Sequence, residues 1–557
     1  GPFLGAFFLS KSVKIISNYP SINKMNKIIL NANHLVINAL TAIKNKNYIE
    51  AKNLLEKAIS IQPEMFEANH NLAILNFQLG NLDSSILYFE KSKKIKPKFS
   101  QVYFNLGLAY DRKKNIDLAI INFKKVIKLD PNNSIALYNI GHLYKEKLEP
   151  IKAEEYLSKS LDLNPNFIKT YDDLFSLYDQ SNQIEKFSNL LDKAKKILSE
   201  KDLVSFYEAV FTYNQKNFKQ TIQILENIDL KENYVAHNIT KHSLLAKSYD
   251  RTNDFEKAYN HFKINNQLFN EYYGKGVNEK SFIELVTQRI KFFKNFNINR
   301  WKQHQLKDEF FQPIFLIGFP RSGTTLLDTI LRTNKSIEVI EEKPILRNFL
   351  RNLDIKIKNN FNHLDNLDKK FIQNMQNFYF EEREQYLENK KTKTVIDKMP
   401  LNIIYIAEIL RFFPNAKFIF ALRNPYDSVL SCFMQQFELN PAMKNFTSLE
   451  SSVILYDLVM KLWTIYRDVF SINCHFIKYE DLVTDFEKTT KEIFKFLEID
   501  WSDNTKNFYI TAKKRLNIST PSYNQITSPL YSRSIGRWKN YEKEFKGLKN
   551  ILDPWLD

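Results

Sequence analysis

The chain has 557 residues, with 80 Lys and Arg against 63 Asp and Glu, which gives a formal net charge of +17. Hydrophobic residues make up 44% and charged residues 26%, which fits a folded protein and excludes wholesale disorder. Eleven glycines and 17 prolines are few for this length, so helices are favoured over Gly-rich β architectures. Two cysteines cannot build a disulfide framework, and a cytoplasmic, reducing location is expected.

The positive charge has two interpretations, a codon bias toward Lys and Asn or attraction of an anionic ligand. Nucleic-acid binding is not expected, because basic residues are interleaved with acidic ones along the whole chain. No stretch approaches the ~20 apolar residues of a transmembrane helix. Residues 1–31 form an N-terminal segment without a predicted fold. Their start at Gly-Pro leaves room for a targeting signal that the chain no longer carries.

From residue 32 to about 200 the sequence repeats with a period of 34 residues, and a degenerate and a weaker unit extend the array to about 275. The recurring prolines are Pro63, Pro97, Pro131 and Pro165. A small residue at Ala51, a large one at Leu55 and an aliphatic one at Leu72 begin columns with the same period. Small residues let two helices approach closely, and proline ends the second helix of each pair. The period therefore predicts an α-solenoid of helix pairs over 32–275.

These columns resemble the tetratricopeptide repeat. The resemblance implies a groove that binds a peptide or protein. The alternative is a scaffold that only packs against the rest of the chain. Peptide or protein binding is the expectation, because the array is longer than packing alone requires.

The period stops before residue 300, and residues 276–305 are expected to link the repeats to a domain over 306–557. Alternating strands and helices predict an α/β domain with a parallel sheet. Its first strand, residues 314–317, runs into the loop Gly318-Phe319-Pro320-Arg321-Ser322-Gly323-Thr324-Thr325 and an apolar helix. Backbone N–H groups of such a loop and the helix dipole bind a phosphate.

The loop has the Gly-x4-Gly spacing of a nucleotide-triphosphate loop, but Thr324 stands where that motif needs lysine. Chemistry on a metal-bound triphosphate is therefore disfavoured, and a kinase is kept as an alternative. A second strand, residues 417–422, ends at Arg423, and the next helix carries Ser431. Arg and Ser at these places suit a second phosphate, with a surface salt bridge as the alternative for Arg423. Two phosphate sites predict a nucleotide phosphorylated at both ends.

Together the two motifs resemble those of sulfotransferases that use 3′-phosphoadenosine 5′-phosphosulfate (PAPS). With the repeats, the arrangement is most similar to tyrosylprotein sulfotransferases and their repeat-bearing bacterial relatives. The resemblance implies a P-loop-like sulfotransferase domain, PAPS as the sulfuryl donor and no metal. It places the 5′-phosphosulfate at Arg321, Ser322, Gly323, Thr324 and Thr325. It places the 3′-phosphate at Arg423 and Ser431.

Further matches imply the remaining site residues. Glu342 falls on the family's catalytic base, Lys398 on a lysine that steadies the sulfuryl group, and Tyr479 on a nucleotide contact. A lid near the C-terminus implies cofactor contacts from Ser522, Gln525, Tyr531 and Arg537, and Ser522 also a catalytic hydrogen bond. The alternatives are a solvated carboxylate for Glu342 and a surface lysine for Lys398. Lys343 and Pro344 follow the Glu pair where the protein-tyrosine enzymes have Thr and Arg, which bears on the acceptor.

The implied reaction is in-line sulfuryl transfer, with Arg321, Lys398 and Ser522 at the transferring group and Glu342 as general base. A tyrosine in a peptide or protein is the expected acceptor. The hydroxyl of a small molecule, lipid or glycan is the alternative, as is a non-catalytic repeat adaptor. A homodimer is among the assemblies that the resemblance allows.

Overall fold

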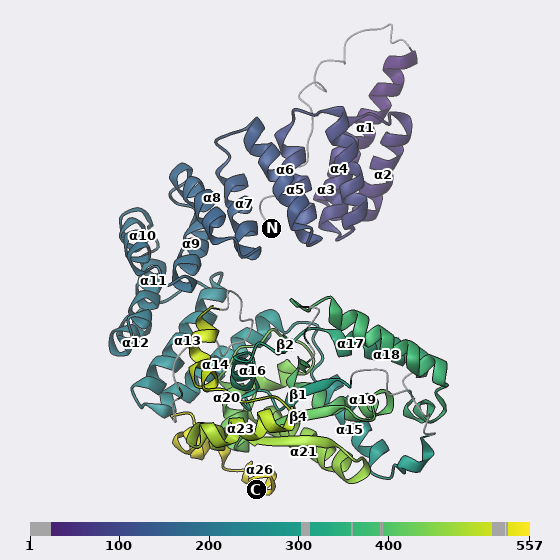
Figure 1. Ribbon diagram of the computed structural model, residues 1–557. Helices are drawn as coiled ribbons and strands as arrows, with labels where there is room; N and C mark the ends of the chain where they lie inside the picture. Colours follow the sequence, from purple (N-terminus) through teal and green to yellow (C-terminus); the bar gives the residue numbers. More distant parts are fainter. Residues whose placement is uncertain are drawn as a thin grey trace. The chain divides into compact units, whose positions relative to one another are not determined.

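The computed structural model describes residues 24–301, 312–357, 360–389, 392, 394–514, 530 and 533–556. The chain divides into two compact units, with the division between Asn217 and Phe218 (Figure 1). Each unit is described by itself. None of the helices in the described ranges combines the length and apolarity that a membrane crossing requires.

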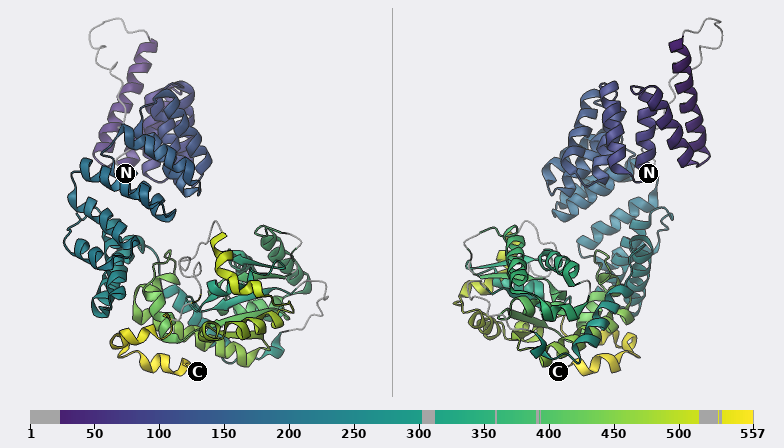
Figure 2. Two further views of the ribbon diagram at one scale, coloured as in Figure 1. Left: turned by 60° about the vertical axis from the view of Figure 1, so that its left-hand side comes forward. Right: turned by 90° about the vertical axis from the view of Figure 1, so that its right-hand side faces the viewer.

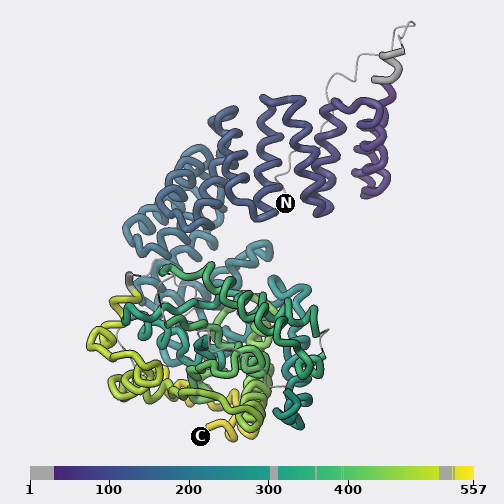
Figure 3. Tube along the Cα trace, turned by 45° about the vertical axis from the view of Figure 1, so that its right-hand side comes forward, coloured from purple at the N-terminus to yellow at the C-terminus, as the bar shows by residue number. Residues whose placement is uncertain are grey.

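The first unit consists of helices α1 to α11, which follow one another as antiparallel hairpins (Figure 3). Their bounds are α1 Lys24–Lys44, α2 Tyr48–Ile61, α3 Phe66–Gln78, α4 Leu82–Ile95, α5 Ser100–Arg112, α6 Ile116–Leu129, α7 Ser134–Glu146, α8 Pro150–Leu163, α9 Ile168–Gln180, α10 Ile184–Ile197 and α11 Lys201–Asn214. Pro63 follows the end of α2, where the period predicts a helix to stop. The predicted helix pairs are confirmed.

The 34-residue period also governs burial and turn geometry. The small-residue column is buried, as are Leu55 and Leu72 with their equivalents in the next three repeats. The tight turn inside each pair contains one residue with positive φ. These residues are Lys46, Gly80, Lys114, Leu148, Asn182 and Lys216. The turn thus keeps its left-handed geometry through six repeats although only one of them supplies glycine.

The second unit opens with further repeat helices, α12 (Phe218–Glu226), α13 (Val235–Arg251) and α14 (Phe255–Tyr273). The expected linker contains a regular helix, α15 (Lys280–Phe293), which packs on α21. Its Arg289 is buried and forms a 2.6 Å ion pair with Glu408. The predicted domain limits stay predictions, but this part of the linker is folded onto the α/β domain.

The α/β domain contains five parallel strands in the order β2-β3-β1-β4-β5. They are β1 Ile314–Gly318, β2 Ile337–Glu341, β3 Thr394–Lys398, β4 Lys417–Leu422 and β5 Asn473–Lys478. Helices lie on both faces of the sheet (Figures 1 and 2). The predicted fold class, a helical repeat array followed by an α/β domain with a parallel sheet, is confirmed.

The two faces of the sheet are built from alternating strand residues. Leu316 and Ile419 face an aliphatic core under α16, α23 and α24. Phe315 and Phe420 face the opposite layer, where they contact Tyr379 of α18 and Trp463 of α21. The helix bounds are α16 Thr324–Leu331, α17 Ile345–Ile357, α18 Lys369–Glu384, α19 Ile406–Phe412, α20 Pro425–Phe433, α21 Leu449–Val469, α22 Tyr479–Thr484, α23 Phe486–Phe496, α24 Phe508–Lys514 and α26 Lys549–Leu552.

Candidate active site

A candidate site residue or loop lies at the carboxyl end of each of the five strands. The phosphate loop follows β1, Glu342 follows β2, Lys398 ends β3, Arg423 follows β4 and Tyr479 follows β5. Because the strands are parallel, these ends meet at one edge of the sheet. The chain passes from β1 to β2 on one side and later to β4 on the other. A reversal of this kind opens a crevice at the strand ends, where ligands of open α/β sheets bind.

A cavity of about 1080 Å³ lies at this edge. Most of the residues predicted from the sequence line it. They are Arg321, Gly323, Thr324, Thr325, Glu342, Arg423, Ser431, Tyr479 and Arg537. Ser322 and Lys398 are buried beside it and do not line it. Ser522, Gln525 and Tyr531 lie outside the described residues.

The phosphate loop depends on a glycine at its junction with α16. Gly323 has φ +100°, and a Cβ atom there would lie 2.9 Å from Cδ2 of Tyr479. Both the left-handed backbone and the close ring therefore exclude a side chain. Arg321 also has positive φ, 68°. The strained turn exposes the N-terminal end of α16 to the cavity, as phosphate binding requires.

Arg423 lies beside the loop rather than in a surface salt bridge. Its Nη1 donates to the backbone oxygen of Arg321 at 3.1 Å and its Nη2 to that of Ser534 at 2.6 Å. The guanidinium group stacks 4.9 Å from the centre of the Tyr479 ring, whose hydroxyl lies 2.8 Å from Ser534 Oγ. Within the described ranges Arg423 forms no ion pair, so its charge remains available to an anion in the cavity.

The two arginines and the loop fit a doubly phosphorylated nucleotide. Arg321 Nε donates to Ser431 Oγ at 3.0 Å, which joins the first predicted phosphate site to the second. Arg423 Nε and Ser322 Oγ are buried polar atoms without a hydrogen-bond partner among the described residues. Buried polar groups are normally satisfied, so unpaired donors beside a cationic cavity are expected where an anion binds.

Lys398 connects the two carboxylates that follow β2. Its Nζ lies 2.7 Å from Glu342 Oε1 and 3.2 Å from Glu341 Oε1. Register explains this contact, because Glu341 and Lys398 are neighbours across the β2–β3 ladder and the Glu342 N–H donates to the Lys398 carbonyl at 2.8 Å. Glu342 has φ 51°, a strained conformation of the kind that gathers at functional sites.

The side chain of Lys398 has no solvent exposure, whereas that of Glu342 is 37% exposed. The alternative of a surface lysine is therefore wrong. Burial lowers the pKa of Lys398, but the neighbouring carboxylates Glu342, Glu341 and Asp328 outweigh it, so the pKa lies above the ordinary value. Lys398 is therefore a buried cation that contacts Glu342, and Glu342 in turn lines the cavity.

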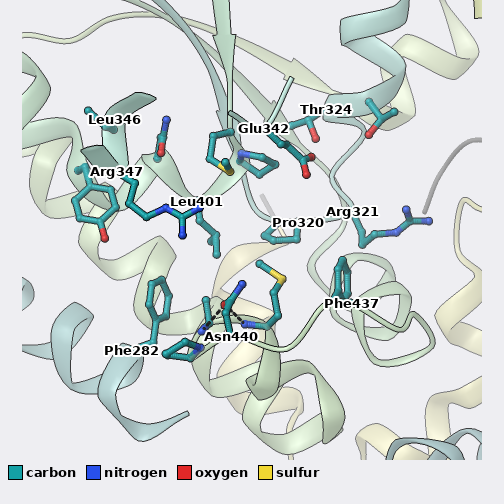
Figure 4. A pocket seen from close by; sticks show the side chains of 18 of the residues that line it. Phe282, Pro320, Arg321, Thr324, Glu342, Leu346, Arg347, Leu401, Phe437 and Asn440 are labelled. Carbon is teal, nitrogen blue, oxygen red and sulfur yellow. Dashed lines mark hydrogen bonds between the residues drawn. The ribbon is translucent and has the colours of Figure 1, made fainter. Parts of the chain in front are cut away.

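The far end of the cavity contains Lys343, which the sequence analysis connected with the acceptor, and further residues that it missed. Figure 4 shows the Glu342 carboxylate and the Arg347 guanidinium directed into the cavity, with Leu401 near Arg347 and Phe282 on a part of the wall away from Glu342. Phe282 comes from α15, before the α/β domain begins. Lys343, Arg347 and Arg351 are spaced by four residues and all line the cavity. Arg347 and Arg351 lie four residues apart on α17, and that spacing was the signal available in the sequence.

Arg537 reaches the cavity from the C-terminal part of the chain, in the 3₁₀ helix η7 (Arg537–Phe545). Its Nη2 lies 2.8 Å from Asp250 Oδ1 of α13. No pattern in the sequence predicts that a repeat helix meets a lid residue. Ser534, which bonds both Arg423 and Tyr479, was also missed. Among the described residues there is no group of three or more His, Cys, Asp or Glu that could hold a metal ion.

Comparison with known proteins finds families that match two parts of the chain. The model of the sulfotransferase family matches residues 313–503. Residues 313–503 form a sulfotransferase-family domain. Tetratricopeptide-repeat models match residues 42–106, 100–133 and 122–155, so the chain combines this sulfotransferase domain with repeats.

Several curated proteins match part of the chain. An uncharacterized protein of Aquifex aeolicus is 24% identical over 392 residues, 66% of this chain and 50% of that one. Protein-tyrosine sulfotransferase 2 of Gallus gallus is 26% identical over 40% of this chain, and protein-tyrosine sulfotransferase of Drosophila melanogaster is 24% identical over 40%. The matches span 62% and 46% of those two relatives.

A tetratricopeptide repeat protein from Parabacteroides merdae is a solved structure similar to the repeats, at 14% identity and a TM-score of 0.34. It covers 43% of this chain and 93% of its own.

Proposed function

We propose that this chain transfers a sulfuryl group from PAPS to an acceptor hydroxyl. One observation carries the proposal: Arg321 and Arg423, the two predicted phosphate ligands, line a single cavity together with Glu342. A nucleotide phosphorylated at both ends needs two cationic sites on one cavity. The match of residues 313–503 to the sulfotransferase family supports the same reaction class.

The donor, when bound, supplies an activated sulfuryl group attached to a good leaving phosphate. Arg321, the N–H groups at the start of α16 and the Ser322 hydroxyl hold its 5′ end. Arg423, Ser431 and Tyr479 hold its 3′ end, and Arg537 adds a further cation. In-line transfer forms a bond from the acceptor oxygen to sulfur while the bond from sulfur to the leaving oxygen breaks. Protein cations then face the charge that collects on the leaving group.

Glu342 accepts the proton of the acceptor hydroxyl in this proposal. It is the carboxylate that is both accessible to the cavity and held in place by a lysine 2.7 Å away. A phenol has a pKa near 10, so a base within hydrogen-bond reach assists its attack. Lys398 orients this base. Its contact with the transferring group stays a prediction, because Lys398 is covered by Glu342 in this structure.

We propose tyrosine in a peptide as the acceptor. Two relatives that match 40% of this chain bear the name protein-tyrosine sulfotransferase, which supports this choice. The apolar residues Phe282 and Leu401 line the same cavity as Glu342 and suit an aromatic ring, and Lys343, Arg347 and Arg351 suit acidic groups around it.

The test is incubation of the full chain with ³⁵S-labelled PAPS and a panel of tyrosine peptides, small phenols, lipids and glycans. We expect label on tyrosine peptides, with acidic ones labelled faster. Label on glycans, lipids or small phenols alone would replace the acceptor but keep the reaction. Absence of transfer to every acceptor, with nucleotide binding intact, would favour a repeat adaptor. Transfer from ATP without PAPS would favour a kinase.

A further inference from the structure

The last turn of repeat helix α13 contacts a residue of the nucleotide cavity. Asp250 precedes the final residue of α13, and its side chain is 13% exposed. One carboxylate oxygen, Oδ1, accepts from Arg537 Nη2 at 2.8 Å and from the Tyr541 hydroxyl at 2.7 Å. Both partners belong to η7, almost 300 residues later in the chain. The contact lies within the second unit, so the two elements are parts of one compact body.

Other hydrogen bonds hold the backbone around Arg537 but not its side chain. The N–H groups of Gly536 and Trp538 donate to the carboxylate of Asp427 in α20, at 2.7 and 2.9 Å. The Trp538 ring stacks on Tyr426 of the same helix, with ring centres 4.2 Å apart. These contacts fix where η7 begins. They leave the direction of the Arg537 guanidinium to be set by Asp250 and Tyr541.

Further contacts make α13 and α14 a firm base for this interaction. Phe255, the first residue of α14, meets the Tyr541 ring edge to face at 5.4 Å. Asn266 of α14 donates to the backbone oxygen of Phe433 at the end of α20, at 2.8 Å. Tyr541 is 2% exposed. The repeat helices therefore pack on both elements, α20 and η7, that surround the phosphate-binding side of the cavity.

We propose that Asp250 is a positioning residue for nucleotide binding, which acts by orienting Arg537 toward the phosphate groups. The inference rests on the proposed function. A free arginine loses side-chain entropy when a ligand immobilises it. Asp250 removes this cost beforehand, because it engages one N–H of a group that has five and leaves others for the ligand. The last repeat hairpin is then a structural part of the enzyme site.

Asp250→Asn tests this directly, because it removes the charge while keeping the size of the side chain and an oxygen that can accept from Tyr541. The probe is adenosine 3′,5′-bisphosphate, titrated calorimetrically into the full chain. We expect binding weakened about five- to thirtyfold. The matched control is Asp254→Asn, which removes the same charge four residues later. Asp254 caps α14, accepting from the Lys257 N–H at 3.2 Å, and Asn caps helices equally well, so binding should be unchanged.

A double-mutant cycle separates positioning from a general loss of structure. If Asp250 acts through Arg537, then Asp250→Asn should weaken binding in the native background and have little further effect in an Arg537→Gln background. A merely structural role would weaken binding in both backgrounds by the same factor. Tyr541→Phe provides a milder variant, which removes one hydrogen bond to Asp250 and should weaken binding less than Asp250→Asn.

The outcomes distinguish this inference from the proposed function. If the native chain fails to bind adenosine 3′,5′-bisphosphate, the proposed function fails. If the native chain binds it and Asp250→Asn binds equally well or more tightly, only the positioning role is overturned. Equal factors in the two backgrounds of the cycle would overturn it as well.

Discussion

The repeat unit and the sulfotransferase domain bury different kinds of polar groups. Buried polar residues of the repeats before residue 217 are mostly neutral, with Asp173 and His70 as the ionisable members of that set. The second unit, which contains the sulfotransferase domain, buries full charges, among them Lys398, Glu408 and Arg289. Burying an ion costs several kcal/mol unless it is paired. The repeats before residue 217 are therefore stabilised mainly by packing of neutral side chains. The second unit buries charged groups at and below a binding site despite the energetic cost.

The ion pairs of the repeats support the same contrast. Lys193 and Asp162, in neighbouring hairpins, lie 3.2 Å apart with exposed side chains. Such pairs contribute about 0–1 kcal/mol each and are screened by salt. Arg289 and Glu408, by comparison, are 4% and 2% exposed. Four predictions test this difference between the two regions.

The largest effect is expected on the turnover of a variant at Glu342, the exposed carboxylate that pairs with the buried Lys398. Glu342→Gln should lower kcat by about 10²–10⁴-fold and leave the affinity for adenosine 3′,5′-bisphosphate unchanged, because it removes a base and not a phosphate ligand. The measurement is ³⁵S transfer with calorimetry alongside. Glu341→Gln is the matched control, since Glu341 bonds the same lysine but does not line the cavity, and it should affect kcat less. Equal turnover in Glu342→Gln would remove it from the mechanism.

Next in size is the effect of removing one partner of a buried pair. Arg289→Met leaves Glu408 uncompensated and should lower the free energy of unfolding of the second unit by about 3–5 kcal/mol. Lys193→Met should cost the first unit at most about 1 kcal/mol. All five tryptophans lie after residue 300, so their fluorescence in urea reports the second unit, and far-UV circular dichroism reports both.

The double variant Arg289→Met/Glu408→Leu serves as the control for that experiment. It should be more stable than Arg289→Met, because no buried charge is left unpaired. If Arg289→Met and Lys193→Met cost the same, the contrast between the two regions would be wrong.

Substitution of two glycines by alanine should affect different properties, stability in the repeats and nucleotide binding in the α/β domain. At Gly107 a Cβ atom would lie 2.7 Å from the Phe123 ring, so Gly107→Ala should destabilise the repeats by about 1–3 kcal/mol and leave nucleotide binding intact. Gly323→Ala should instead weaken binding of adenosine 3′,5′-bisphosphate, because it distorts the phosphate loop against Tyr479. Gly80→Ala is the control, with φ +82° but no atom within 4 Å, and should cost about 1 kcal/mol. Unfolding in urea and calorimetry measure both quantities, and a Gly323→Ala variant with native affinity would contradict the role of the loop.

The smallest effect is a pair of opposite pH dependences. Burial, with Lys96 nearby, lowers the pKa of His70 from its ordinary value of 6.5 to about 4. Between about pH 4 and 6.5 only the unfolded chain therefore binds this proton, and stability rises with pH. Burial raises the pKa of Asp397 to about 7, against its Tyr379 hydrogen bond and Arg383. Between pH 3.8 and about 7 the folded chain keeps that proton, and stability falls with rising pH.

Each slope amounts to at most about 1.4 kcal/mol per pH unit. Hydrogen exchange followed by mass spectrometry measures the two regions of the full chain separately. His70→Leu should flatten the slope for α3 and α4, and Asp397→Asn the slope for β1 and β3. Slopes of the same sign in both regions would contradict these assignments.

Much of the fold could be predicted from the sequence because its patterns are local. The 34-residue period places helix ends, buried columns and turns within one repeat or between neighbours, as Ala51 and Pro63 illustrate. Strands β1 and β4 were predicted from runs of apolar residues at 314–317 and 417–422. Residues 276–305 were expected to link the two parts because they lack the repeat period, yet α15 packs there on α21. The apolar face of α15 packs on a helix far along the chain, and local sequence patterns do not identify such a distant partner.

The amino-acid order by itself identified the residues that can bind an anion. A glycine-bounded loop and an arginine at a strand end are both recognisable from adjacent residues. Only the tertiary structure decided which of them meet. Parallel pairing brings Lys398 under Glu342, so the lysine is a buried support instead of a surface group, and packing of α13 on η7 brings Asp250 to Arg537. These contacts join residues 56 and 287 positions apart. Local sequence patterns describe neighbours along the chain, whereas an ion pair depends on the distance between two groups in the folded structure.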